Sequence, residues 1–176
     1  LTNDSHQSSR ILINKCVELN KERKKITALI EHEAMQVAQD EYAMKRKFLV
    51  ITNKKWHPGI IGIVAARIVE KFNLPTAILS LANDGIYRGS IRSNNKLNVN
   101  IALNECSDIL IAHGGHSAAA GFSIKEENIP ILKKMLNNIA IRELKNCDLS
   151  KSIKPDAHIS FKDINLEFYS QLLLIG

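Results

Sequence analysis

The chain has 176 residues, enough for one full domain and a small or incomplete second element. Its 24 Lys and Arg against 18 Asp and Glu give a net charge of +6, which fits an anionic partner such as nucleic acid. The three cysteines form no CxxC pair, so neither a disulfide framework nor a zinc site is indicated. No stretch approaches the roughly 20 apolar residues of a membrane span, and the polar start has no signal-peptide core. We therefore expect a soluble, cytoplasmic protein with free thiols and no membrane partner.

A long helix is expected over residues 8–47, which contain no Pro or Gly. Apolar or small residues recur there at the spacing of one helix face. They are Leu12, Cys16, Leu19, Ile26, Ile30, Ala34 and Val37. We interpret residues 1–47 as a rigid connector helix.

The middle of the chain, residues 48–147, has the pattern of an α/β domain. Strands are expected at 48–52, 76–81 and 86–92, with a tight turn at 83–85, and a helix from Pro58 to about Phe72. Further along, residues 97–111 and 128–147 favour helices, and 118–124 favours a small-residue strand that follows a glycine loop.

The end of the chain has a different residue pattern. Residues 148–155 are polar, as in a linker, and a new pattern opens at Asp156. We expect a strand at 158–161 and helical or extended chain at 166–175, the start of a truncated further domain in 148–176. The chain does not begin with Met and stops in an apolar run, so we expect it to be an excised fragment.

The segment from Gly114 to Gly121 carries the strongest candidate site. Adjacent Gly114 and Gly115 let backbone N–H groups approach a ligand without Cβ obstruction, and Gly121 leaves space for a close neighbour. His116 beside them can donate to a phosphate or line an active site. The alternative is a glycine helix stop followed by a tightly packed strand with a surface histidine.

A second candidate lies on the expected strand at 86–92. Period-two alternation puts Arg88, Ser90 and Arg92 on one face, and guanidinium groups on a rigid strand suit consecutive phosphates. The alternative is an exposed strand face whose arginines pair with acids elsewhere.

A third candidate precedes the expected helix at Pro58. His57 lies where backbone N–H groups at a helix N-terminus favour anions. The neighbouring Trp56 either stacks on a base or anchors the core.

The sequence shows no DHH, no DxD and no Asp, Glu and His cluster able to hold two divalent ions. Two-metal phosphodiester hydrolysis needs those carboxylates. We therefore expect no metal site and no cleavage activity in these residues alone.

Taken in this order, these segments resemble the DHHA1 domain of the DHH phosphoesterase superfamily, whose GGHxxAAG signature is matched in full by residues 114–121. The RecJ-type branch is indicated by two further runs, WHxGxxGIVAxR at 56–67 and GSxRS at 89–93. The long helix, with Leu19-Asn20 and Glu22-Arg23, is also similar to the connector of that branch.

The resemblance implies a DHHA1-type domain with a small mixed sheet flanked by helices, followed by the opening of an oligonucleotide-binding fold. It implies a 5′ to 3′ exonuclease on single-stranded DNA in recombination and repair, with Mn²⁺ or Mg²⁺ held by a separate DHH domain. Repair proteins such as a helicase or a single-strand-binding protein are possible partners. It implies substrate binding by residues of the three segments. They are His57, Arg88, Ser90, Arg92, Ser93, Gly114, Gly115, His116 and Gly121.

Three alternatives stay open. The first is an oligoribonuclease or cyclic-dinucleotide phosphodiesterase of the same superfamily, and the second is a non-catalytic nucleic-acid-binding module. The third, an editing-type domain of a synthetase, gains no support from the runs at 56–67 and 89–93.

Overall fold

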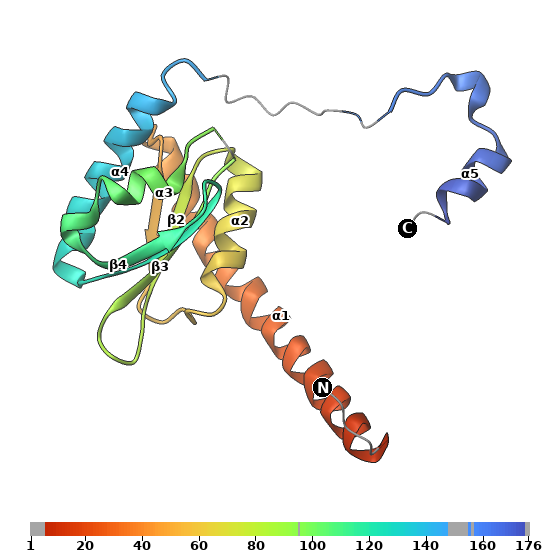
Figure 1. Cartoon of the computed structure of the whole chain (residues 1–176), viewed down its shortest axis with the longest axis horizontal. Coiled ribbons are helices and arrows are strands. Elements are labelled where there is room, and N and C mark those ends of the chain that lie inside the picture. Colours follow the sequence, from red (N-terminus) through yellow and green to blue (C-terminus); the bar gives the residue numbers. More distant parts are fainter. Residues whose placement is uncertain (1–5, 95, 148–154, 156, 175–176) are drawn as a thin grey trace.

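The structure, a computed structural model, describes residues 6–94, 96–147, 155 and 157–174. It has a long first helix, a five-stranded sheet with helices on both faces, and a short final helix (Figure 1). The elements are α1 (His6–Ala43), β1 (Leu49–Thr52), α2 (Ile61–Phe72), β2 (Thr76–Leu81), β3 (Tyr87–Arg92), α3 (Val99–Asn104), β4 (Leu110–Gly115), β5 (Ala119–Ile124), α4 (Ile129–Glu143) and α5 (Leu166–Leu172). The predicted α/β class with a small mixed sheet is confirmed.

The sheet has the order β1-β2-β3-β5-β4. Strands β1 and β2 are parallel and joined through α2, and all other pairs are antiparallel. The turn between β2 and β3 uses Gly85 at a φ of 78°, a conformation that glycine adopts without steric cost. Strand β4 lies at one edge, and β5 is inserted between it and β3.

Two apolar cores lie on opposite faces of this sheet. One packs α3 and α4 against side chains from β1, β2, β3 and β5, including Tyr87, Ile91 and Phe122. The other packs α1 and α2 against β1 and β2 alone, among the residues that the structure describes. The face of the sheet that α2 covers therefore has an apolar core only on its β1–β2 side.

Helix α1 packs with its second half only. Residues 10–26 are exposed, and the buried positions begin at Thr27 and continue through Ile30, Ala34 and Ala38. The expected apolar face was partly wrong, because Leu12, Leu19 and Val37 are exposed whereas Ala38 is buried. Small residues at 34 and 38 let α1 approach β1 and α2 closely, which a valine on that side would hinder.

Helix α1 is also fixed to the domain by polar contacts. The Trp56 indole nitrogen donates to Glu33 at 2.8 Å, and Arg67 of α2 pairs with Glu31. Trp56 is 4% exposed. Of its two sequence interpretations, the core anchor is the one that the structure supports.

The expected helix at 97–111 was wrong over much of its length. Helix α3 ends at Asn104, a 3-10 turn follows at Ser107–Ile109, and β4 then runs from Leu110 to Gly115. The glycines that were expected in a loop therefore end a strand. Strand β4 is an edge strand with most side chains exposed, so it lacks the apolar alternation that identifies a strand.

The end of the chain differs as well. Residues 157–160 form no strand, a 3-10 turn occupies Phe161–Asp163, and α5 follows. The expected linker at 148–155 lies, except for Pro155, outside the described residues. Within the described part of the chain, no helix is both long and apolar enough to cross a membrane.

The buried thiol of Cys106, shortly after α3, provides a test of how this part of the chain packs. Burial, aided by the charge of Glu105, raises the pKa of this thiol from 9.0 to about 11. The folded state therefore gains stability from the protonated thiol below about pH 9 and loses it as pH rises through about 11. We expect a thiol reagent at pH 8 to modify exposed Cys16 and to leave Cys106 unmodified until urea unfolds the chain, measured by mass spectrometry. Equal rates at both cysteines would contradict this packing.

Gly89 provides a second test of the core. A Cβ at this position would lie 2.1 Å from the Phe122 ring, so Gly89→Ala should lower the free energy of unfolding by about 2 kcal/mol. Urea denaturation measures the change. In a Phe122→Leu background the same substitution should cost less, because the smaller side chain leaves space. Equal costs in both backgrounds would contradict the contact.

Candidate nucleic-acid interface

The side chains of strand β3 point alternately to the two faces of the sheet. Tyr87, Gly89 and Ile91 are buried, and the intervening Arg88, Ser90 and Arg92 are partly exposed on the opposite face. The predicted alternation is confirmed. Each strand residue advances about 3.3 Å, so the Cα atoms of Arg88 and Arg92 are about 13 Å apart. The two arginines can therefore contact different phosphates of one extended strand.

On the β5 side of Ser90 the row of paired residues carries no side chains. Ser90 pairs with Gly121 of β5, and Gly121 pairs with Gly114 of β4. We call Gly121 and Gly114 the glycine floor. A Cβ on Gly121 would meet only the Gly89 carbonyl oxygen at 3.7 Å, and one on Gly114 would meet no described atom within 4 Å. Neither glycine has a positive φ, so neither the fold nor the backbone conformation requires glycine there.

A shallow depression of about 340 Å³ lies on the Arg88 side of Gly121. It is lined by Arg88, Gly89, Ala112, His113, Gly121, Phe122 and Ser123. A bare backbone floor beside arginines lets a ligand lie close to the sheet while its anionic groups meet guanidinium donors.

The Arg92 guanidinium is held above Ser90. Its Nη1 donates to Ser90 Oγ at 3.0 Å and to the Ile91 carbonyl at 2.8 Å. Helix α2 lies against the same group, because a Cβ on Gly62 would be 2.9 Å from Arg92 Nη2. Arg92 is thus fixed between β3 and α2.

Arg88 has an acidic partner in this structure. Its Nη2 donates to Asp84 in the β2–β3 turn at 2.5 Å. The pKa of Asp84 is lowered, chiefly by the hydrogen bond from the Ile86 N–H and further by Arg88. Arg88 must share or exchange this carboxylate in order to bind an anion, whereas Arg92 has no acidic partner among the residues that the structure describes.

The β4–β5 hairpin carries His116 at its turn. Gly115 has a φ of 152°, and a Cβ there would lie 2.4 Å from Ala120 Cα, so this glycine is required by the fold. The turn is fixed by hydrogen bonds from the N–H groups of Ser93 and Val99, both 2.9 Å long, to carbonyls of the turn. His116 itself is exposed.

Ser93, which was expected to bind the substrate, does not present its hydroxyl to a ligand in this structure. Its N–H is used by the hairpin, and its Oγ is buried without a hydrogen-bond partner among the described residues. A buried hydroxyl of this kind can bind a ligand only after a local change, so Ser93 supports the hairpin in this conformation.

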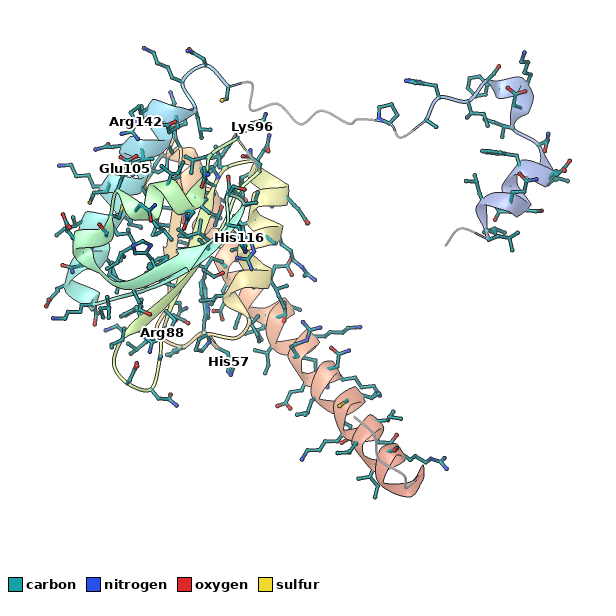
Figure 2. The ribbon with its side chains drawn as sticks, viewed as in Figure 1. His57, Arg88, Lys96, Glu105, His116 and Arg142 are labelled. Atoms are coloured by element: carbon teal, nitrogen blue, oxygen red, sulfur yellow. The ribbon has the colours of Figure 1, made fainter. Side chains whose placement is uncertain are left out.

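His57 lies at the other end of β3 from the hairpin. Its loop follows β1, where the Asn53 N–H bonds the Leu79 carbonyl, and its Nδ1 accepts from the Gly59 N–H at 3.1 Å. Exposed His57 lines a separate depression of about 370 Å³. The other residues of that depression are Leu19, Glu22, Arg23, Ile26, Gly59 and Ile60. Figure 2 shows His57 and Arg88 low in the domain and His116 higher in the view.

The described residues contain no group of three or more His, Cys, Asp or Glu side chains placed to hold a metal ion. Apart from Asp84, which binds Arg88, and Glu22 in the depression beside His57, the residues described above are basic, neutral or glycine. They suit an anionic ligand.

A family model described as the DHHA1 domain matches residues 45–142, more than half of the chain. The chain belongs to the DHHA1 domain family. The matched range contains all five strands and α2, α3 and most of α4. The candidate interface is therefore part of the DHHA1 domain itself.

The relatives are single-stranded-DNA-specific exonucleases named RecJ. The chain is 33% identical to that of Bacillus subtilis over 90% of its own length and 20% of the relative's. It is 28% identical to that of Escherichia coli over 97% of its own length and 30% of the relative's. The crystal structure of Thermus thermophilus RecJ in complex with Mg²⁺ superimposes with a TM-score of 0.71 at 28% identity, covering 80% of this chain and 21% of that one. The chain thus spans between a fifth and a third of these relatives.

Two residues of the candidate interface could not be singled out from the sequence. Gly62 was noted only as part of a motif, although a glycine inside a helix that packs on a sheet indicates a close contact. Asp84 was assigned to the turn, although a carboxylate four residues before Arg88 across a tight hairpin is within reach of it.

Substitution of Gly114, Gly115 and Gly121 by alanine should change the free energy of unfolding in two different ways. Gly115→Ala should lower the free energy of unfolding by about 2 kcal/mol or more, because both the φ and the Ala120 backbone oppose a side chain. Gly114→Ala and Gly121→Ala should leave it unchanged or raise it by up to about 1 kcal/mol, since alanine restricts the unfolded chain. Urea denaturation of the three variants measures this. A cost at Gly121 equal to that at Gly115 would show that the glycine floor is required by the fold.

Proposed function

We propose that this chain is the nucleic-acid-binding part of a 5′ to 3′ single-stranded-DNA exonuclease of recombination and repair. In this proposal the DHHA1 domain binds the phosphates of the strand. A DHH domain elsewhere in the longer protein hydrolyses the phosphodiester bond and holds Mn²⁺ or Mg²⁺. Residues 1–47 connect the two parts, residues 48–147 bind the substrate, and 148–176 begin a further domain.

One observation carries the proposal: Arg92, Ser90 and the glycine floor share one face of the sheet, which α2 covers only in part. Guanidinium and hydroxyl donors there suit phosphate oxygens. The absence of side chains on Gly121 and Gly114 lets a sugar–phosphate backbone come close to the strands. The similarity to RecJ exonucleases along at least nine-tenths of the chain points to single-stranded DNA as the ligand.

The residues have different proposed roles in binding the strand. Arg92, Ser90, Gly114 and Gly121 form the central contact, and Arg88 joins it by releasing Asp84. His116 and His57 lie at the two ends of β3 and would contact neighbouring nucleotides. Gly115 and Ser93 act by shaping the hairpin that carries His116.

A second candidate function is an oligoribonuclease or cyclic-dinucleotide phosphodiesterase activity of the same superfamily. The same open face would accept a short RNA or a dinucleotide. Competition by RNA of equal length distinguishes these substrates from DNA. A non-catalytic binding module is distinguished by the sequence of the longer protein, which would then lack the DHH motif and its partner aspartates. A helicase or single-strand-binding protein remains a proposed partner.

Binding to a short 5′-phosphorylated single strand across a salt series tests the proposal. We expect affinity to fall as salt rises, because phosphate contacts release counterions. Arg92→Ala should weaken binding about tenfold and reduce the magnitude of the salt slope by about 1. His116→Ala should also weaken it if the strand extends over the hairpin. The chain incubated with Mn²⁺ and the same strand should show no cleavage on a gel.

Arg142→Ala is the matched control. Arg142 is an exposed arginine of α4 that binds Glu105 directly after α3, and Figure 2 shows these two residues close together. Helices α3 and α4 pack on the face of the sheet that carries Tyr87 and Ile91, opposite to the face of Arg92. This variant removes the same charge and should bind DNA like the wild type. If Arg92→Ala and Arg142→Ala lose the same affinity for DNA, net charge alone drives binding. If Arg92→Ala loses no affinity, β3 is not part of the interface.

A further inference from the structure

Gly62 lies in the first turn of α2, directly over the arginine strand. A Cβ at this position would be 2.9 Å from Arg92 Nη2, 3.0 Å from Ser90 Oγ and 3.6 Å from Arg92 Cζ. The first two distances are shorter than side chains normally allow. An alanine at position 62 would therefore displace the guanidinium, the hydroxyl or both.

The helix itself gives no reason for glycine at position 62. Gly62 does not have a positive φ, and glycine inside a helix is less favourable than alanine. The contacts that its missing Cβ permits are those with Arg92 and Ser90. Glycine at this position thus lowers helix stability and permits close approach of α2 to the guanidinium.

The Arg92 guanidinium is consequently restrained on two sides. From below, Nη1 is held by Ser90 Oγ and the Ile91 carbonyl at 3.0 and 2.8 Å. From the side, Nη2 lies against the α2 backbone at Gly62. A long arginine side chain loses conformational freedom when it binds a ligand, and a side chain already restrained loses less.

We infer that Gly62 is a positioning residue, which sets the orientation of the Arg92 guanidinium for binding a phosphate of the strand. This inference rests on the proposed function, and it adds a residue from a different element to the interface. Helix α2 then determines how tightly β3 binds its ligand without contacting that ligand itself.

Gly62→Ala, Arg92→Ala and the double variant test the inference through binding of the same 5′-phosphorylated single strand. We expect Gly62→Ala to weaken binding about tenfold, a size typical of coupled neighbours. In the Arg92→Ala background the same substitution should have no further effect, since no guanidinium remains to be displaced. Thermal unfolding should show Gly62→Ala at least as stable as the wild type, because alanine favours the helix.

A measurement without DNA provides a second readout. The Arg92 Nε–Hε group gives an NMR signal whose order parameter reports how firmly the guanidinium is held. We expect a lower order parameter and a shifted resonance in Gly62→Ala. An unchanged signal would overturn the inference whatever the binding data show.

The binding outcomes separate the inference from the proposed function. If Arg92→Ala binds like the wild type, the proposed interface is wrong and the inference falls with it. If Arg92→Ala loses affinity but Gly62→Ala does not, the interface stands and the inference is overturned. If Gly62→Ala loses the same affinity in both backgrounds, Gly62 acts by a route other than Arg92, which also overturns it.

Discussion

The alternation of side chains along β3 is the constraint on which both the core and the candidate interface depend. Tyr87 and Ile91 complete the core beneath α3 and α4, so the residues between them must face the other side. Gly89 extends this constraint, because the Phe122 ring occupies the space where its side chain would be. A slip of one residue would bury two arginines and expose the core.

Helix α2 and the glycine floor then decide what the free face can bind. The apolar core under α1 and α2 reaches only β1 and β2 among the described residues, which leaves β5 and β4 open. The close approach of α2 at Gly62 fixes Arg92 at the border of this open area. The result is a basic border beside a surface of bare backbone, a combination suited to a polyanion that lies flat.

Much of this arrangement could be predicted from the sequence, and the failures have physical causes. The period-two pattern of β3 and the turn at Gly85 were sufficient to place Arg88, Ser90 and Arg92 on one face. Edge strand β4 was missed because its exposed side chains give no alternation. The separation of Gly115, required by its φ, from Gly114, which the fold does not require, depends on three-dimensional neighbours that no spacing shows. The pairing of Arg88 with Asp84 likewise depends on side-chain conformation.

The first half of α1 carries exposed apolar side chains that can act in the isolated chain. Figure 1 shows this part of the helix extending beyond the sheet, and Ile11, Leu12, Ile13 and Val17 are between 47% and 63% exposed. Exposed apolar side chains promote association between molecules. At high concentration these side chains favour association between molecules, which would imitate cooperativity in a DNA titration. Dilute protein and labelled DNA keep the two equilibria apart.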